Sequence, residues 1–538
     1  MTASDKPEAP SPTQTAHAGV GRHALLVAAG IFLSRIAGLV RERVIAHFLG
    51  NSFAADALRG ALRIPNILQN LFGEGVLSAS FIPVYARLVA QGEKEESGRV
   101  AGAVFSLLSL VVAVLVLAGV LATPLFVGAI VPGFHGETRT LTIQLVRILF
   151  PGVGLLVMSA WCLGILNSHR RFFLSYASPV VWNGAIVAAL LIFRRADMAH
   201  LAVYASWGSV IGSGLQIAVQ LPVVLKLAPA LRLFFGAGNQ NVRTVIGNFV
   251  PVFISRGVFQ LSAYVDQILA SFLPTGAVST LSVAQALYML PVSLFGMSIS
   301  AAELPAMSSA LGSDEQVAET LRKRINASTR RVAFFVVPSA IGFLALGDVI
   351  AAVIYQGGKF TRADSVWAWG ALAGSAVGLV ASTVGRLYSS AYYALRDTRT
   401  PVRFAILRVG MTTVLGYVSA LQLPRLLHFD PRWGVAGLTA SAGFAAWVEF
   451  LLLRRGMNRR IGRMKFPVIY FAQLWVAAVA AAGLAWDIKL WLHPQRPLIA
   501  AALLLIPYGA AYLGLATLLG VDQAGALVRR VLRVKSRA

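Results

Sequence analysis

The sequence predicts an all-α integral membrane protein that crosses the bilayer many times. Of its 538 residues, 57% are hydrophobic and only 13% are charged, whereas soluble domains carry roughly 25% charged residues. Apolar stretches near the roughly 20 residues that a spanning helix needs recur along the whole chain. A chain this apolar cannot cover itself with a polar surface, so an ordinary soluble fold is excluded.

The apolar stretches predict about fourteen spans. Several exceed the minimum length, which indicates tilted or kinked helices. They lie at residues 24–49, 54–90, 100–131, 141–167, 172–193, 199–225, 243–272, 277–310, 331–356, 364–393, 401–423, 433–454, 466–487 and 497–520. Residues 1–22 are polar and rich in Pro, Ser and Thr, so we predict a disordered tail there.

Basic residues predict the orientation of these spans. The net charge is +25, but Lys and Arg recur in short clusters between apolar stretches and form no single basic domain, so we expect no nucleic-acid partner. With the N-terminus inside, the inside loops hold most of the basic residues, and the positive-inside rule predicts that both termini are cytoplasmic. The inside clusters are Arg170 and Arg171, five residues within 322–331, three within 396–403, six within 454–465 and five within 529–537.

An internal repeat predicts two lobes. Phe32–Arg35 (FLSR) is echoed by Phe253–Arg256 (FISR), and residues 166–183 parallel residues 392–409. Many transporters build two lobes around a central site from such repeats. We therefore predict a disordered cytoplasmic tail at 1–22, an N-lobe of six helices at 23–228, a C-lobe of six helices at 229–460, a C-terminal helix pair at 461–522 and a basic cytoplasmic tail at 523–538.

Charged residues inside apolar helices are the strongest functional signal. Each costs about 2.5–3.5 kcal/mol at mid-membrane, so such residues normally face a cavity or a partner. The first span contains Arg35, Arg41, Glu42 and Arg43. In the second span, spacings of three and four place six polar residues on one face: Asp56, Arg59, Arg63, Asn66, Asn70 and Glu74. An ion-pair network and the polar wall of a water-filled cavity both fit this stripe.

Two more charges lie in the predicted seventh span. Arg256 and Asp266 are ten residues apart, hence roughly 80° apart around a helix and about 15 Å along it, so a direct pair is not expected. Asp266 is a candidate site for a coupling cation or proton, with a structural partner as the alternative.

No motif points to an enzyme. The sequence contains no Walker A motif, no HExxH and no GxSxG. Its single cysteine excludes a disulfide or cysteine-rich metal framework within one chain. We therefore predict no catalytic residues, no cofactor and no metal, although integral lipid transferases can lack familiar signatures.

Three stretches carry a family resemblance. Residues 34–88 (SRIAGLVRERVIAHFLGNSFAADALRGALRIPNILQNLFGEGVLSASFIPVYARL) resemble the start of the MurJ (MviN) lipid II flippases, which belong to the multidrug/oligosaccharidyl-lipid/polysaccharide exporter superfamily. Residues 166–183 and 392–403 are similar to that family as well. The resemblance implies fourteen helices, with a cationic cavity between two lobes and a terminal pair lining a groove for a polyprenyl tail. It also implies transport of lipid II, an undecaprenyl-diphosphate-linked disaccharide-pentapeptide, from the cytoplasmic to the periplasmic leaflet by alternating access.

The same resemblance implies the site residues. Arginine suits a diphosphate because its hydrogen bonds to phosphate are charge-assisted and can be bidentate. Together with the polar stripe, the resemblance predicts a substrate-binding set of Arg35, Arg41, Asp56, Arg59, Arg63, Asn66, Glu74, Arg256 and Ser279. The implied partners are the lipid-linked substrate, the membrane and proteins of cell-wall synthesis or division.

The chain also departs from the family pattern. Gln69 stands where the family commonly has arginine, and Gln285, Ala286 and Met289 replace a charged cluster of helix eight. We expect weaker diphosphate binding unless Arg59 and Arg256 compensate. Two alternatives therefore stay open, namely a flippase for another polyprenyl-diphosphate oligosaccharide and a non-transporting cell-wall scaffold.

Overall fold

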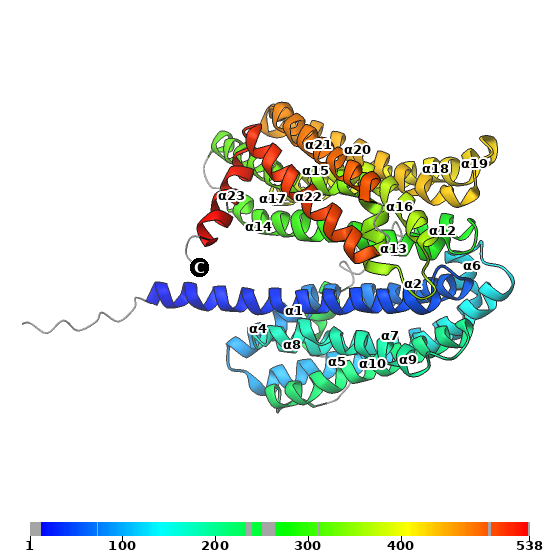
Figure 1. The fold of residues 1–538 in the computed structure, drawn as a ribbon. Coiled ribbons are helices and arrows are strands. Elements are labelled where there is room, and N and C mark those ends of the chain that lie inside the picture. Colours follow the sequence, from blue (N-terminus) through cyan, green and yellow to red (C-terminus); the bar gives the residue numbers. More distant parts are fainter. Residues whose placement is uncertain are drawn as a thin grey trace, which may run out of the picture. The chain divides into compact units, whose positions relative to one another are not determined.

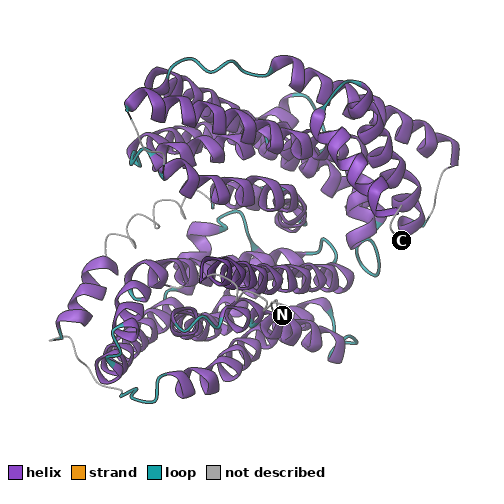
Figure 2. Ribbon diagram, turned by 90° about the vertical axis from the view of Figure 1, so that its left-hand side faces the viewer, coloured by secondary structure: helices purple, strands orange, loops and turns teal. Residues whose placement is uncertain are grey.

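The structure is a computed structural model that describes residues 12–72, 74–232, 239–249, 264–309, 313–492 and 496–535. Within these ranges the chain is helical, and its one extended pairing is an isolated bridge between Gly357 and Phe360 (Figure 2). The all-α class is therefore confirmed.

Most predicted spans are present as helices. Among the described residues, eleven helices are long and apolar enough to cross a membrane: Phe53–Ala90, Lys94–Leu121, Gly136–Ser168, Phe172–Ile192, Met198–Leu227, Ala277–Ser308, Asp314–Tyr355, Arg399–Leu426, Pro431–Ile461, Val468–Leu492 and Pro497–Leu518. A twelfth is added if Arg362–Val377 and Leu379–Ala394, bent by 45°, form one span. All twelve overlap predicted spans.

The count of fourteen is not confirmed. The predicted span at 24–49 falls on helix α1 (Pro12–Leu49), which has four charged residues between 35 and 43 and is not among the eleven. Of the predicted span at 243–272, residues 250–263 lie outside the described residues, so this span is not tested as a whole. Helix α1 also continues through residues 12–22, where composition predicted disorder. Pro12 at its first position suits a helix start, because the missing N–H has no intrahelical partner there.

The chain divides into two compact units. Unit 1 comprises Met1–Ile45, Gly60–Ala129 and Gly136–Leu261, and unit 2 comprises Ala46–Arg59, Ile130–His135 and Ser262–Ala538. The predicted lobe boundaries stay predictions. One feature of the division matters for function: the end of α1, the turn after it and the start of α2 pack within unit 2.

Unit 1 is built from helices on both sides of α7. The helices are most of α1, the part of α2 (Phe53–Phe72) from Gly60 onward, then α3 (Glu74–Ser80), α4 (Ile82–Ala90), α5 (Lys94–Leu121), α6 (Thr123–Ile130), α7 (Gly136–Ser168), α8 (Phe172–Ala177), α9 (Pro179–Ile192) and α10 (Met198–Leu227) (Figure 1). The core surrounds Trp161, whose Nε1 donates to the Ala101 carbonyl at 3.2 Å. Between α7 and α10, Ser159 bonds Gln216 and Gln220, a polar link typical of helices packed in lipid.

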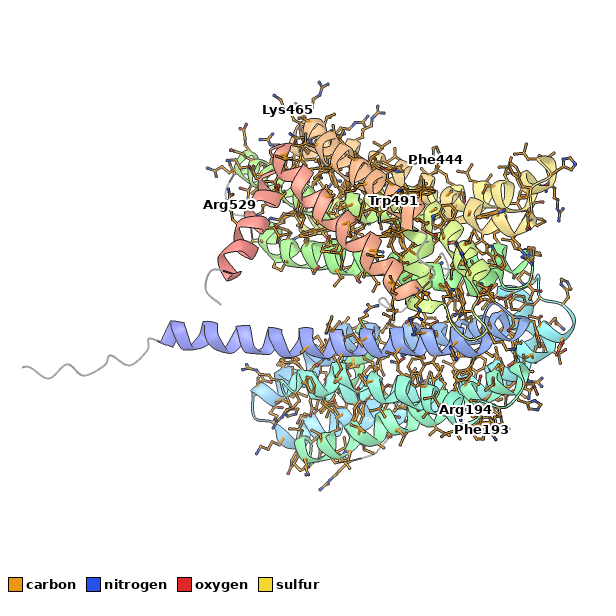
Figure 3. The ribbon with its side chains drawn as sticks, viewed as in Figure 1. Phe193, Arg194, Phe444, Lys465, Trp491 and Arg529 are labelled. Carbon is orange, nitrogen blue, oxygen red and sulfur yellow. The ribbon has the colours of Figure 1, made fainter. Side chains whose placement is uncertain are left out.

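Unit 2 contains the remaining helices: α12 (Val265–Ser271), α13 (Ala277–Pro291), the π-helix η1 (Val292–Met297), α14 (Ser298–Ser308), α15 (Asp314–Tyr355), α16 (Arg362–Val377), α17 (Leu379–Ala394), α18 (Arg399–Tyr417), the π-helix η2 (Val418–Gln422), α19 (Leu423–Leu426), the 3₁₀ helix η3 (Pro431–Trp433), α20 (Gly434–Ile461), α21 (Val468–Leu492), α22 (Pro497–Leu518) and α23 (Asp522–Lys535). Large apolar side chains point outward from this unit, including Phe444 at 54% and Trp491 at 87% exposure (Figure 3). Such a surface is suited to lipid and unsuited to water.

Polar anchors fasten the pair α21–α22 to α15, and the three helices lie side by side in Figure 1. Three tyrosine hydroxyls, from Tyr470, Tyr508 and Tyr512, donate to the carbonyls of Arg330, Pro338 and Phe334 at 3.1, 2.6 and 2.6 Å. These acceptors are four residues apart and share one face of α15. Farther along that helix, Trp486 donates to the Ala345 carbonyl and Lys489 pairs with Asp348 at 2.7 Å.

The bond from Tyr512 compensates for a proline. Pro338 has no N–H, so the Phe334 carbonyl four residues earlier lacks its helical donor, and Tyr512 supplies one. Tyr512→Phe leaves that buried carbonyl without a donor, which costs about 1–3 kcal/mol. We expect it to lower the denaturation midpoint of the purified protein more than Tyr508→Phe does. The Tyr508 acceptor, the Pro338 carbonyl, lies four residues before Gly342, whose N–H a regular helix directs at that carbonyl. Equal losses for both variants would contradict this explanation.

Candidate functional site

Asp56 caps a helix other than its own. It lies in the first turn of α2, with 3% of its surface exposed. Its Oδ2 accepts from the Gly276 backbone N–H at 2.6 Å, and its Oδ1 accepts from the Ser279 N–H at 2.7 Å. These amides belong to the N-terminus of α13, where free N–H groups and the helix dipole favour a negative charge. A carboxylate from a distant part of the chain therefore completes this helix end.

Arg59 and Asn51 complete this group. Arg59 lies one turn after Asp56 with 5% exposure, and its Nη1 donates to both the carbonyl and the hydroxyl of Ser279. The Ser279 hydroxyl donates to Asn51 Oδ1 at 2.8 Å. We call these five residues, Asn51, Asp56, Arg59, Gly276 and Ser279, the Asp56 cluster. It is a buried polar network within unit 2, and such networks specify one arrangement strongly when their groups are satisfied.

A second contact holds the same turn. Asn51 Nδ2 donates to Asp364 Oδ1 at 3.1 Å, and Asp364 forms the capping box of α16 with Thr361. The Lys359 N–H donates to the His47 carbonyl at 2.8 Å. Gly50, with φ +59°, lies so close to this loop that a Cβ would stand 2.5 Å from the Lys359 carbonyl oxygen. The residues 46–59 thus touch the beginnings of both α13 and α16.

The arginines of α1 lie in unit 1. Arg41 Nη2 pairs with Glu42 Oε1 at 2.7 Å, and its guanidinium carbon stands 4.9 Å from the ring centroid of Trp182 on α9. The buried Nε of Arg41 has no hydrogen-bond partner among the described residues. Arg35, two turns earlier, is exposed. Unit 1 therefore presents one arginine held by neighbours and one open to its surroundings.

The other predicted residues are dispersed. Arg63 and Asn66 are half-buried on α2 in unit 1. Glu74 is the first residue of α3, and its side chain lies outside the described residues, as does the whole of Arg256. Asp266 is half-buried in the first turn of α12 in unit 2.

The polar stripe of α2 is therefore divided between two surroundings. Asp56 and Arg59 lie buried in unit 2, whereas Arg63 and Asn66 belong to unit 1. The two interpretations of the stripe, an ion-pair network and a cavity wall, both stay predictions, and Asp56 and Arg59 lie one turn apart on α2. The closest partners of both residues are nevertheless groups of α13, and Arg59 is engaged there by Ser279.

Sequence reasoning missed Asn51, Gly276, Asp364 and Trp182. Gly276 could have been found, because Pro274-Thr275-Gly276 before an apolar stretch is a turn signal followed by a helix start. For Trp182 there was no signal, since a tryptophan in an apolar helix is ordinary and its partner Arg41 is 141 residues away in sequence.

Comparison with known proteins identifies the family. The family model for the lipid II flippase MurJ matches residues 45–495. A lipid II flippase MurJ of Burkholderia cenocepacia is 31% identical over 519 residues, covering 93% of this chain and 98% of the relative. A probable lipid II flippase MurJ of Rickettsia prowazekii is 30% identical over 434 residues, covering 80% and 82%.

Solved structures agree on the fold. A lipid II flippase MurJ in an inward closed conformation matches with a TM-score of 0.76 at 22% identity, over 93% of this chain and 99% of that one. An inward-facing multidrug resistance MATE family transporter of the MOP superfamily matches with a TM-score of 0.64 at 16% identity, over 81% and 98%. The protein is a multispanning membrane protein with a transporter fold. Because the family model covers more than half of the sequence, the chain belongs to the lipid II flippase MurJ family.

Proposed function

We propose that this protein moves lipid II from the cytoplasmic to the periplasmic leaflet of the bacterial inner membrane by alternating access. The observation that carries the proposal is the family match over residues 45–495, supported by relatives named as lipid II flippases that align over most of their length. The comparisons favour neither alternative, another lipid-linked oligosaccharide or a non-transporting scaffold, which the departures at Gln69 and Ala286 had left open.

The headgroup is bound by the basic residues of unit 1 in this proposal. Lipid II carries a diphosphate between its sugar and its polyprenyl chain, so binding needs cationic donors within the membrane. Arg35 is exposed, Arg41 has a buried Nε without a partner, and Arg63 and Asn66 continue along α2. Charge-assisted hydrogen bonds from arginine to phosphate are roughly twice as strong as neutral ones. Glu74 stays in the proposed set on the polar stripe and the family resemblance, and Arg256 stays in it as a charge within the predicted seventh span.

The Asp56 cluster acts as a gate in this proposal. Asp56, Arg59 and Ser279 were predicted to bind substrate, but all three are almost fully buried and bonded to one another or to nearby backbone. We assign them to the contact that residues 46–59 make with α13. Alternating access requires that contact to break and reform in each cycle.

Asp266 is the proposed ion-coupling residue. The membrane potential supplies about 2.3 kcal/mol per charge per 100 mV, so net charge moved through the cavity can drive the cycle too. Placing both termini in the cytoplasm puts the basic connector between α20 and α21, which includes exposed Lys465, on the same side (Figure 3). Proteins of cell-wall synthesis or division are proposed partners on the resemblance alone.

Complementation tests the function. The native lipid II flippase of a tractable bacterium is depleted, and this protein, Arg41→Ala or Arg194→Ala is supplied at matched membrane levels. Arg194 is an exposed arginine in the turn between α9 and α10, so it serves as the control (Figure 3). We expect rescue by wild type and Arg194→Ala and no rescue by Arg41→Ala. Failure of the wild type combined with rescue by Ala286→Arg would mean that the site is built for another substrate.

A further inference from the structure

Trp182 meets Arg41 through its ring face. The guanidinium carbon of Arg41 lies 4.9 Å from the ring centroid, and cations within about 6 Å of an indole face are attracted by its quadrupole. A carboxylate partner would occupy the N–H donors of an arginine, as Glu42 does at Nη2. A ring holds the cation from its face and leaves the in-plane donors available.

Arg41 has an N–H donor without an acceptor among the described residues. Its side chain is 18% exposed, and its Nε is buried with no hydrogen-bond partner in the described part of the chain. Buried donors nearly always have an acceptor, and one that lacks it within the protein indicates an acceptor from elsewhere. A phosphate oxygen is such an acceptor, and it favours the charged guanidinium.

Trp182 is itself fixed in place. Its Nε1–H donates to Ser209 Oγ on α10 at 3.1 Å. Helices α9 and α10 approach closely there, because a Cβ on Gly212 would lie 2.9 Å from the Trp182 carbonyl oxygen and one on Gly208 would lie 2.8 Å from Ala189 Cβ. Glycines four residues apart permit this kind of close packing between membrane helices. The orientation of the ring is thus set by α10.

We propose that Trp182 is a positioning residue for the diphosphate of the substrate, acting through Arg41. The ring holds the guanidinium in one orientation, so that its free Nε donor is already aimed when the anion arrives. Preorganisation of this kind raises affinity by reducing the entropy lost on binding. The inference rests on the proposed headgroup role of Arg41. Because Gln69 and Ala286 stand where relatives commonly have arginines, the orientation of Arg41 matters more in this chain.

The test measures binding of two lipids that differ in charge. Purified protein in nanodiscs is titrated with undecaprenyl diphosphate and with uncharged undecaprenol. The variants are Trp182→Leu, Trp182→Phe, Arg41→Ala and the double variant Arg41→Ala with Trp182→Leu. Trp447→Leu is the matched control, because Trp447 also donates across a helix pair, to the Val377 carbonyl, but its ring packs on Phe450. Thermal melting of each variant reports folding.

We expect Trp182→Leu to weaken binding of undecaprenyl diphosphate by about 2- to 30-fold, the range of a cation–π contact, and to leave undecaprenol binding unchanged. Trp182→Phe keeps an aromatic face and is expected to retain most of the affinity. In the Arg41→Ala background, Trp182→Leu is expected to cause no further loss, since the two residues act as one unit. Trp447→Leu is expected to change neither affinity.

Two results would overturn the inference while leaving the proposed function intact. In the first, Trp182→Leu lowers the affinity for undecaprenyl diphosphate and for undecaprenol by the same factor. In the second, Trp182→Leu lowers the affinity for undecaprenyl diphosphate as much in the Arg41→Ala background as it does in wild type. Either would show that Trp182 acts on the fold of unit 1 and not through Arg41. If Arg41→Ala itself leaves undecaprenyl diphosphate binding unchanged, the headgroup role of Arg41 fails, and the inference about Trp182 fails with it.

Discussion

Asp56→Ala is expected to abolish transport while leaving the protein in the membrane. The substitution removes the acceptor of two backbone N–H groups, those of Gly276 and Ser279, at a site where Asp56 is 3% exposed. Each buried donor left unpaired costs about 1–3 kcal/mol, so the contact of residues 46–59 with α13 weakens by about 2–6 kcal/mol. At about 1.4 kcal/mol per factor of ten, the ratio of proteins with this contact made to those with it broken falls at least tenfold.

Rescue and cysteine accessibility measure this effect. Ala55 is fully buried beside Asp56, and the native Cys162 is buried as well, so Ala55→Cys reports opening of the contact to a membrane-impermeant maleimide with little background. Labelling is expected to be slow with Asp56 intact and fast with Asp56→Ala. Asp197→Ala is the matched control, since Asp197 also caps a helix, accepting from the His200 N–H at 3.0 Å, but is exposed. Full rescue by Asp56→Ala with unchanged labelling would refute the gate.

Gly276→Ala is expected to give the same loss by a steric route. Gly276 has φ +95°, a conformation that costs a non-glycine residue about 1–2 kcal/mol. The new Cβ would also stand 2.6 Å from the Asn51 carbonyl oxygen and 2.7 Å from the Trp367 ring. Real Cβ atoms do not approach that closely, so the turn at Asn51 must withdraw from α13. We therefore expect no rescue in complementation and fast labelling at Ala55→Cys.

Gly483→Ala is the control for this substitution. Gly483 is exposed on α21 and nothing lies within 4 Å of a Cβ placed there. Alanine in a helix interior is favoured over glycine by roughly 0.5–1 kcal/mol. This variant is therefore expected to rescue growth and to have a slightly higher melting temperature than wild type. If Gly276→Ala rescues as well as Gly483→Ala does, the contact between the Asn51 turn and α13 is not needed for transport.

The sequence predicted the helices better than their partners. Apolar stretches located twelve spans because length and hydropathy are local properties. All six polar residues of the second span were expected to face the same environment. In the structure, the residues up to Arg59 belong to unit 2 and those from Gly60 onward belong to unit 1. The reason is the pairing of Asp56 with amides some 220 residues later in the chain, and local periodicity contains no such information. The family resemblance pointed to Ser279 without revealing that its backbone N–H, as well as its hydroxyl and carbonyl, is bonded to residues near the start of α2.

The arginines show the same limit. Charge in an apolar helix marked Arg41 and Arg59 alike as substrate ligands. The structure separates them by their surroundings, because Arg59 donates to Ser279 within unit 2 whereas Arg41 pairs with Glu42 and lies beside Trp182 within unit 1. Which groups an intramembrane arginine meets depends on packing between helices that are distant in sequence. Composition also failed at residues 12–22, which are polar yet continue α1.

The anchoring of α21–α22 on α15 has a thermodynamic consequence. Three tyrosine hydroxyls, an indole N–H and an ion pair join these helices, so the pair moves with α15 as one body. A polyprenyl chain lying along the pair would meet the same surface at every stage of the cycle. A ligand group that binds two conformations with equal affinity does not shift their populations, however tightly it binds. The tail would then keep the substrate bound to the protein, and of the two parts of the substrate only the charged head would favour one conformation over the other.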